Sequence, residues 1–173
     1  MDYKFVYKRS QKLELIGYVD VDLGGCVGTK KSTSGLVFLF RGSWKSVKQS
    51  IIATCMMQAE YIACYEEASQ AIWLRNLIKS LRVVESIGRR ILIWNDNTAT
   101  VFFTKSNKRS SGNRHLDFKY YTVREKVKSR DILAEHTNTH SMIADPLNKA
   151  LPATVFHGHV KSMGLLPSFD MLD

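Results

Sequence analysis

The sequence of 173 residues has few cysteines and prolines and no long apolar run, which excludes several specialised classes of protein. It has three cysteines, at positions 26, 55 and 64, and no Cys-x-x-Cys spacing, so neither a disulfide framework nor a zinc site is indicated. Three prolines and ten glycines exclude collagen-like and low-complexity chains. No apolar run approaches the length of a membrane span, about 18 residues, and residues 1–11 are too polar for a signal peptide. We therefore expect a protein of an intracellular, reducing compartment.

The sequence instead has the composition of a globular protein with an excess of positive charge. Its hydrophobic content of 45% and charged content of 24% are ordinary, and its length fits one domain. The net charge of +9 indicates a polyanionic partner. Residues 89–130 hold 11 Lys and Arg against 3 Asp and Glu, so the excess is concentrated there.

The densest basic stretch, residues 105–115, is also rich in Ser, Asn and Gly, which predicts an irregular loop. Such a loop can grip phosphates without reading the base sequence. The alternative is a basic face that is merely solvated. The candidate nucleic-acid-binding residues are Lys105, Lys108, Arg109, Arg114 and His115.

The hydrophobic pattern predicts strands first, then alternating helices and strands. Strands are expected at residues 13–22, 34–40, 44–52, 90–95 and 131–135, with a tight turn at 41–42. Helices are expected at 54–81, with Thr54 as a cap, from 98 to 103, at 115–128, and at 141–163 with interruptions near Pro146 and Pro152. This order indicates an α/β protein whose mixed sheet has helices on its faces.

Two carboxylates fall at positions that the pattern predicts to be buried. Asp20 lies within the first long strand on the same face as Tyr18, and buried aspartates are rare unless they are paired or bind a metal. Glu60 lies with Met57 and Cys64 on the apolar stripe of the long helix, where a carboxylate needs a cation or a hydrogen-bond donor. The ordinary alternatives are a solvated strand end for Asp20 and a boundary position for Glu60.

Two more carboxylates occur near predicted element ends. Asp96 follows a buried strand at its carboxyl end, where open α/β sheets bind ligands, and its alternative role is to cap the next helix. Asp145 precedes Pro146, and its alternative role is to open a helix. Clustered carboxylates need a cation, hard oxygen ligands suit Mg²⁺ or Mn²⁺, and two such ions support phosphodiester cleavage. We interpret Glu66 and Glu67 as residues that keep the long helix soluble.

Nine phrases also follow one another in a fixed order along the sequence. They are GYVDVD (17–22), KSTSG (31–35), WKSVKQ (44–49), QAEYIA (58–63), AIWLR (71–75), WNDN (94–97), RHLD (114–117), REK (124–126) and IADPL (143–147). Together they resemble the ribonuclease H domain of copia-type LTR-retrotransposon Pol polyproteins. The resemblance implies a ribonuclease H-like fold, with a five-stranded mixed sheet and helices on both faces.

The resemblance also implies an activity and a set of site residues. The implied enzyme is an endoribonuclease that cleaves the RNA strand of RNA–DNA hybrids during reverse transcription, with two Mg²⁺ ions as cofactors and Mn²⁺ as the alternative. Four residues are implied as metal ligands and catalytic carboxylates: Asp20, Glu60, Asp96 and Asp145. His136 or His140 is a candidate for proton shuttling or product release, and the alternative for both is a surface histidine without such a role.

The resemblance further sets expectations for domains, partners and location. Residues 1–12 are expected to be the remnant of a connection to a reverse-transcriptase segment, 13–166 the ribonuclease H-like domain, and 167–173 a tail. The expected partners are an RNA–DNA hybrid, recognised by its shape and 2′-hydroxyls, and the reverse-transcriptase domain of the same polyprotein or in trans. No membrane partner is expected. The expected location is intracellular, either cytoplasmic in virus-like particles or nuclear.

Several positions depart from the family pattern and leave a second hypothesis open. Residues 22–25 read DLGG where the family usually has DWAG, Gln58 replaces a Glu, and the turn after Phe40 is short. The second hypothesis is a catalytically silent remnant that keeps the fold and binds nucleic acid or a polymerase partner. An integrase or transposase of related fold is disfavoured, because position 131 holds Asp where that class needs a Glu.

Overall fold

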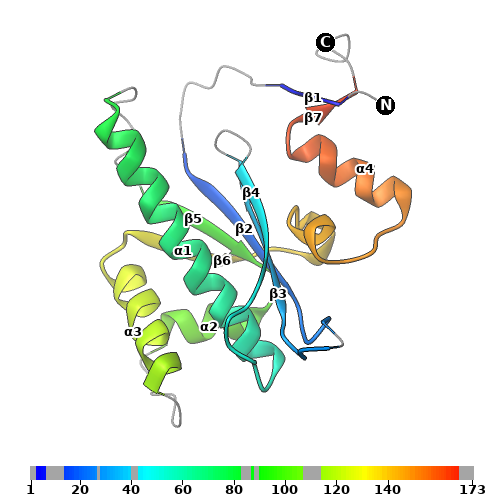
Figure 1. The fold of residues 1–173 in the computed structure, drawn as a ribbon. Coiled ribbons are helices and arrows are strands. Elements are labelled where there is room, and N and C mark those ends of the chain that lie inside the picture. Colours follow the sequence, from blue (N-terminus) through cyan, green and yellow to red (C-terminus); the bar gives the residue numbers. More distant parts are fainter. Residues whose placement is uncertain are drawn as a thin grey trace.

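The computed structural model describes residues 3–6, 14–26, 28–39, 43–82, 87, 90–106 and 114–167. Its centre is a five-stranded sheet with the strand order β4-β3-β2-β5-β6 (Figure 1). The strands are β2 (Ile16–Asp22), β3 (Thr33–Phe38), β4 (Ser43–Lys48), β5 (Ile91–Asn95) and β6 (Ile132–His136). β2 pairs antiparallel with β3 and parallel with β5, so the sheet is mixed, as the sequence predicts.

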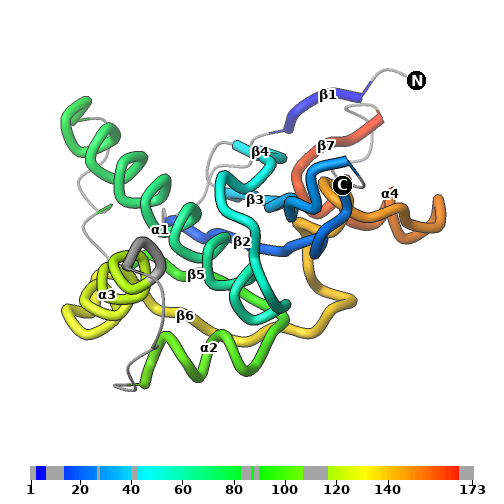
Figure 2. The backbone as a smooth tube through the Cα atoms, turned by 60° about the horizontal axis from the view of Figure 1, so that its bottom comes forward, coloured from blue at the N-terminus to red at the C-terminus, as the bar shows by residue number. Residues whose placement is uncertain are grey.

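The helices are distributed over both sides of this sheet. They are α1 (Met56–Ser80), α2 (Thr98–Lys105), α3 (Arg114–Lys128), α4 (Ala153–Ser162) and the 3₁₀ helices η2 (Thr139–Ser141) and η3 (Asp145–Leu147). α1 packs on β2, β3 and β5, and α3 packs on α1. Figures 1 and 2 show α4 well away from these helices, and η3 contacts β3. The α/β architecture with helices on both faces is therefore confirmed.

The larger core lies between α1 and the sheet. Val19 and Val21 of β2 face α1 and are at most 2% exposed, because successive strand residues point to opposite faces. On α1, the Tyr61 hydroxyl donates to the backbone carbonyl of Tyr120 in α3 at 3.2 Å, and the two rings pack edge to face. These contacts fix the N-terminal half of α1, which carries Glu60, against the sheet.

A smaller core lies on the opposite face of the sheet. Tyr18 of β2 packs there with Met142, which lies between η2 and η3. Gly35 of β3 allows this segment to approach closely, since a Cβ at that position would lie 3.0 Å from the backbone oxygen of Ala144. The close approach brings Asp145 next to β2 and β3.

The start of α1 differs from the sequence-based expectation. Cys55 occupies the cap position, and its side chain makes no capping hydrogen bond. Both the backbone N–H and the hydroxyl of Thr54 instead donate to Oε1 of Gln58, at 2.6 Å and 2.8 Å. The expectation that Thr54 caps the helix is therefore wrong. Its hydroxyl donates to the side chain of Gln58, and Cys55 occupies the cap position.

Of three other expectations, one is confirmed, one is wrong, and one concerns residues that the structure does not describe. The helical segment expected at 141–163 is interrupted near Pro146 and Pro152 as predicted, and it consists of η2, η3 and α4, because proline cannot continue α-helical hydrogen bonding. Glu67 is not a solvated helix residue, since it is 0% exposed. The turn expected at 41–42 lies outside the described residues.

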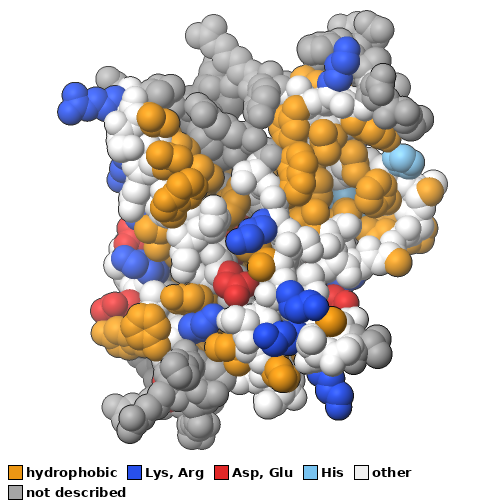
Figure 3. Space-filling view, viewed as in Figure 1, with side chains coloured by type: hydrophobic (Ala, Val, Ile, Leu, Met, Phe, Trp, Pro, Cys, Tyr) orange, Lys and Arg blue, Asp and Glu red, His pale blue; other side chains and the backbone are white. Residues whose placement is uncertain are grey.

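A second, two-stranded sheet joins distant parts of the chain. β1 (Lys4–Phe5) pairs antiparallel with β7 (Leu165–Leu166), a pairing that the sequence did not predict. Phe5 stacks on Trp44 of β4, with ring centroids 5.7 Å apart. Figure 3 shows apolar side chains gathered on the surface over β1, β7 and α4. Among the described residues, no helix combines the length and the apolar character needed to span a membrane.

Candidate metal centre

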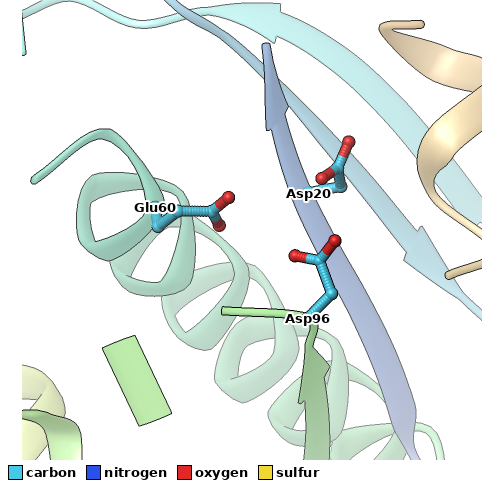
Figure 4. A group of neighbouring side chains, drawn as sticks. All are labelled: Asp20, Glu60 and Asp96. Atoms are coloured by element: carbon cyan, nitrogen blue, oxygen red, sulfur yellow. The ribbon is translucent and has the colours of Figure 1, made fainter. Parts of the chain in front are cut away.

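Three carboxylates from three separate elements meet at one edge of the central sheet. Asp20 belongs to β2, Glu60 to the beginning of α1, and Asp96 directly follows β5. One oxygen atom of each lies within 4.8 Å of the others. Figure 4 shows the three side chains pointing toward one another. Because β2 and β5 are parallel neighbours, their carboxyl ends meet at the same edge and bring Asp20 and Asp96 together.

Glu60 is oriented by a buried amide that the sequence analysis missed. Nδ2 of Asn95 donates to Oε2 of Glu60 at 3.0 Å, and Oδ1 of Asn95 accepts from the backbone N–H of Asn97 at 2.6 Å. The second bond fixes which end of the amide faces Glu60. Asn95 is 2% exposed and is therefore a positioning residue for this carboxylate.

Asp96 does not serve as a helix cap. Asn97 caps α2, because its side-chain oxygen accepts from the backbone N–H of Thr100 at 3.1 Å. The Asp96 carboxylate instead accepts from the Thr139 hydroxyl, with 3.4 Å between the oxygen atoms. The alternative capping role is therefore wrong, and the carboxylate of Asp96 faces the other two acids.

The electrostatics of the cluster favour a cation. Burial raises the pKa of Glu60 to about 8, and the negative charge of Asp20 adds to this effect. Burial also raises the pKa of Asp20 and of Asp96. A cation bound between carboxylates opposes these shifts, because it stabilises the ionised form.

The donor set also fits a divalent metal ion. Oδ2 of Asp20 is buried and accepts no hydrogen bond from the described part of the chain. A buried acceptor without a partner costs free energy, which a metal ion bound there would recover. Several carboxylate oxygens in one small site are the ligands that Mg²⁺ and Mn²⁺ prefer. These residues therefore form a site that could hold a divalent ion.

Asp145 lies beside the cluster and is joined to it by a lysine. Asp145 is 4% exposed and is the first residue of η3. Nζ of Lys149 lies 3.0 Å from Oδ1 of Asp145 and 2.8 Å from Oδ1 of Asp20. Burial by itself lowers the pKa of Lys149, but the hydrogen bonds and charges of the two carboxylates outweigh it and raise the pKa. Asp145 and Asp20 thus share one ammonium group, and Asp20 also faces Glu60 and Asp96.

The two candidate histidines lie outside the carboxylate cluster. His136 ends β6, is exposed, and is paired in the sheet register with Asn95. His140 is an exposed residue of η2. Their catalytic roles stay predictions.

The structure describes only part of the basic stretch. Lys105 ends α2, and its Nζ lies 3.1 Å from Oε1 of Glu135 in an exposed ion pair. Lys108 and Arg109 lie outside the described residues. Arg114 and His115 open α3, and their side chains also lie outside the described part of the chain. The binding of nucleic acid by these five residues stays a prediction.

Two functional candidates, Asn95 and Lys149, were absent from the sequence-based site. Asn95 follows Ile93 by two residues, so it shares the buried face of β5, where an amide needs a partner. Lys149 follows Asp145 by four residues, a spacing at which opposite charges meet in a helical segment. Both signals are present in the sequence, but neither shows which carboxylate is the partner.

Comparison with known proteins shows that the chain is similar to part of transposon Pol polyproteins. It is 29% identical over 145 residues to the retrovirus-related Pol polyprotein from transposon TNT 1-94 of Nicotiana tabacum. The aligned region covers 82% of this chain and 11% of the relative. No family model matches the sequence. The chain spans about a tenth of the length of the curated relatives that it matches first.

Solved structures with the same fold are ribonucleases H. The N-terminal RNase H domain of Rv2228c from Mycobacterium tuberculosis, solved as a fusion with maltose-binding protein, matches with a TM-score of 0.55 and 12% identity, over 87% of this chain and 99% of that one. LC11-RNase H1 in complex with an RNA/DNA hybrid matches with a TM-score of 0.53 and 16% identity, over 78% and 93%. The chain is therefore a homologue of a segment of retrovirus-related Pol polyproteins of transposons, and it has the ribonuclease H fold.

Proposed function

We propose that this chain is a metal-dependent ribonuclease H that cleaves the RNA strand of RNA–DNA hybrids. The observation that carries the proposal is the meeting of Asp20, Glu60 and Asp96, with ligand atoms within 4.8 Å of one another, in a ribonuclease H fold. A neighbour of the same fold has been solved in complex with an RNA/DNA hybrid, which supports the choice of substrate. The transposon relatives support a role in reverse transcription, with a reverse-transcriptase domain as partner.

The cofactor in this proposal is Mg²⁺, bound as two ions, with Mn²⁺ as a substitute. When bound, the ions activate the attacking water and stabilise the leaving oxygen of the phosphodiester. Asp20, Glu60 and Asp96 hold the metal, and Asp145 completes the acidic set. Asn95 keeps Glu60 turned toward the other acids, since it donates to Oε2 at 3.0 Å.

Recognition of the hybrid is proposed to rest on charge and shape. Residues 89–130, which carry 11 Lys and Arg, include β5, α2 and α3, and Asp96 lies directly after β5. Basic groups close to the carboxylates would hold the phosphates of the hybrid. The binding should therefore weaken steeply as salt is added, without strong dependence on base sequence.

One assay tests the proposal. The purified chain and its Asp96→Asn variant are incubated with a hybrid whose RNA strand is labelled, with Mg²⁺ or with EDTA. We expect the wild type to cleave only with Mg²⁺ and the variant to be inactive, because the amide cannot supply the charge of the carboxylate. Cleavage by neither protein would refute the proposal, and cleavage by both would trace the activity to a contaminant. Salt-sensitive binding without cleavage would support the catalytically silent remnant instead.

A further inference from the structure

Lys149 occupies a position between two of the proposed metal ligands. Its Nζ lies 2.8 Å from Oδ1 of Asp20 and 3.0 Å from Oδ1 of Asp145. The two carboxylates are almost completely buried, with side chains 1% and 6% exposed. The contact is also fixed by the backbone, since the N–H of Lys149 donates to the carbonyl of Asp145 at 2.9 Å.

The two oxygen atoms of Asp20 therefore differ. Oδ1 accepts a hydrogen bond from the ammonium of Lys149, whereas Oδ2 is buried and has no hydrogen-bond partner within the described residues. Asp20 also belongs to the group with Glu60 and Asp96. One side of the Asp20 carboxylate is thus available to a metal ion, and the other already carries a positive charge.

We infer that the ammonium of Lys149 occupies the position of the second of two cations, so that the site binds its metal ions one after the other. The first divalent ion binds between Asp20, Glu60 and Asp96. A second ion, between Asp20 and Asp145, enters only when it displaces the ammonium. This inference rests on the proposed function, because it concerns the metal ions of the same site.

Charge and solvation explain why the two ions should differ in affinity. The ammonium already contacts Oδ1 of Asp20 and Oδ1 of Asp145, and a divalent ion placed between the same two oxygens would lie so close to it that both cannot occupy the Asp20–Asp145 pair. The second ion must also give up part of its hydration, which Mg²⁺ does reluctantly. The displaced group has a path out, because the side chain of Lys149 is 34% exposed and has a flexible stem.

The consequence is a built-in order of binding. With no second metal, Lys149 balances the charge of Asp20 and Asp145 and holds η3 against β2. A second ion takes over that role and releases the lysine toward solvent. Without the lysine, the pair of carboxylates should bind the second ion more tightly, because no resident cation competes for it.

Binding of Mn²⁺ tests this order directly. Free Mn²⁺ is followed by electron paramagnetic resonance during titration of the full chain, with wild type, Lys149→Met and Lys149→Arg. We expect the wild type to bind one ion, and a second at least about tenfold more weakly. Lys149→Met should strengthen the second site by about tenfold or more, and Lys149→Arg should keep the wild-type pattern because it retains the charge. Lys126→Met, which breaks the Lys126–Asp131 ion pair away from this site, is the matched control and should change neither site.

The outcomes separate this inference from the proposed function. Two equal Mn²⁺ sites in the wild type would overturn the inference even if the methionine variant does not fold. A second site in Lys149→Met as weak as in the wild type would also overturn it. If the wild type cleaves the hybrid in either case, the proposed function stands and only the inference fails. If the wild type neither binds Mn²⁺ nor cleaves, both fail.

Discussion

Helix α1 carries two buried glutamates in contrasting surroundings. Glu60, near its N-terminal end, is 3% exposed and lies among Asp20, Asp96 and the amide of Asn95. Glu67, two turns later, is 0% exposed and faces the sheet where β2 has Gly17. A Cβ at that glycine would overlap Oε1 of Glu67, so the glycine provides the space for this carboxyl.

The two glutamates show that burial alone does not identify a metal ligand. Neither carboxyl oxygen of Glu67 has a hydrogen-bond partner among the described residues, and burial raises its pKa well above the ordinary value. Burial without a donor or a cation therefore favours the protonated form of Glu67. The pKa of Glu60 is also raised, to about 8, but other acids and a donor surround it. Its neighbours make it part of a cation site, and the neighbours of Glu67 do not.

The two glutamates should differ most in their effect on the rate of hybrid cleavage. Glu60→Gln should lower hybrid cleavage by at least about 100-fold. Loss of a residue that only hydrogen-bonds a metal ligand lowers activity by about 10- to 100-fold, and loss of the ligand itself should cost more. Glu67→Gln should change the rate less than about twofold, since a neutral amide resembles the protonated acid that it replaces. Cleavage rates with Mg²⁺ in excess, together with circular dichroism of each variant, measure the difference.

Either of two results would contradict this assignment. One is a folded Glu60→Gln variant that cleaves as well as the wild type. The other is a Glu67→Gln variant that folds but loses cleavage to the same extent as Glu60→Gln. In the second case the middle of α1, and not only its N-terminal end, would belong to the site.

A smaller effect concerns stability and pH. The pKa of Glu67 is higher in the folded chain than in the unfolded chain, so the acid is protonated in both states below about pH 4.5. As the pH rises above that value, only the unfolded state loses the proton, and the free energy of unfolding falls on the order of 1.4 kcal/mol for each pH unit. The fall continues until the pH reaches the folded-state pKa. Glu67→Gln should therefore be more stable than the wild type at pH 8 and should lose that advantage at pH 4.

Urea unfolding at the two pH values measures this difference. The comparison between the variant and the wild type isolates Glu67, because the other buried acids titrate in both proteins. A stability difference that does not change with pH would mean that the pKa of Glu67 is the same in the folded and unfolded chains. The contrast between the two glutamates would then rest on packing alone.

Much of the fold could be predicted because its signals are local. The apolar run of β5 and the alternation around Val19 in β2 each predict a buried strand, and the Gly- and Pro-free segment predicts α1. The interruptions of the last helical segment near Pro146 and Pro152 were predictable for the same reason, because proline cannot continue α-helical hydrogen bonding. The pairing of β1 with β7 joins the two ends of the chain, and no local pattern encodes so distant a contact.

The site was predictable in its acids but not in their partners. Asp20, Glu60 and Asp96 stand out because a carboxylate on an apolar face needs a reason. Glu67 meets the same criterion, but its position at the edge of the apolar stripe suggested a solvated residue. Only three-dimensional contacts show that Asn95 binds Glu60 and that one lysine bridges two acids.

The position of a bound metal ion in a crystal would show whether these carboxylates are its ligands. Crystals of the chain grown with Mn²⁺ can be measured at a wavelength where manganese scatters anomalously. We expect an anomalous peak between Asp20, Glu60 and Asp96, at about 2.0–2.2 Å from their carboxylate oxygens, and none beside Glu67. If crystals that contain Mn²⁺ show no peak among these three carboxylates, the carboxylates do not form the metal site.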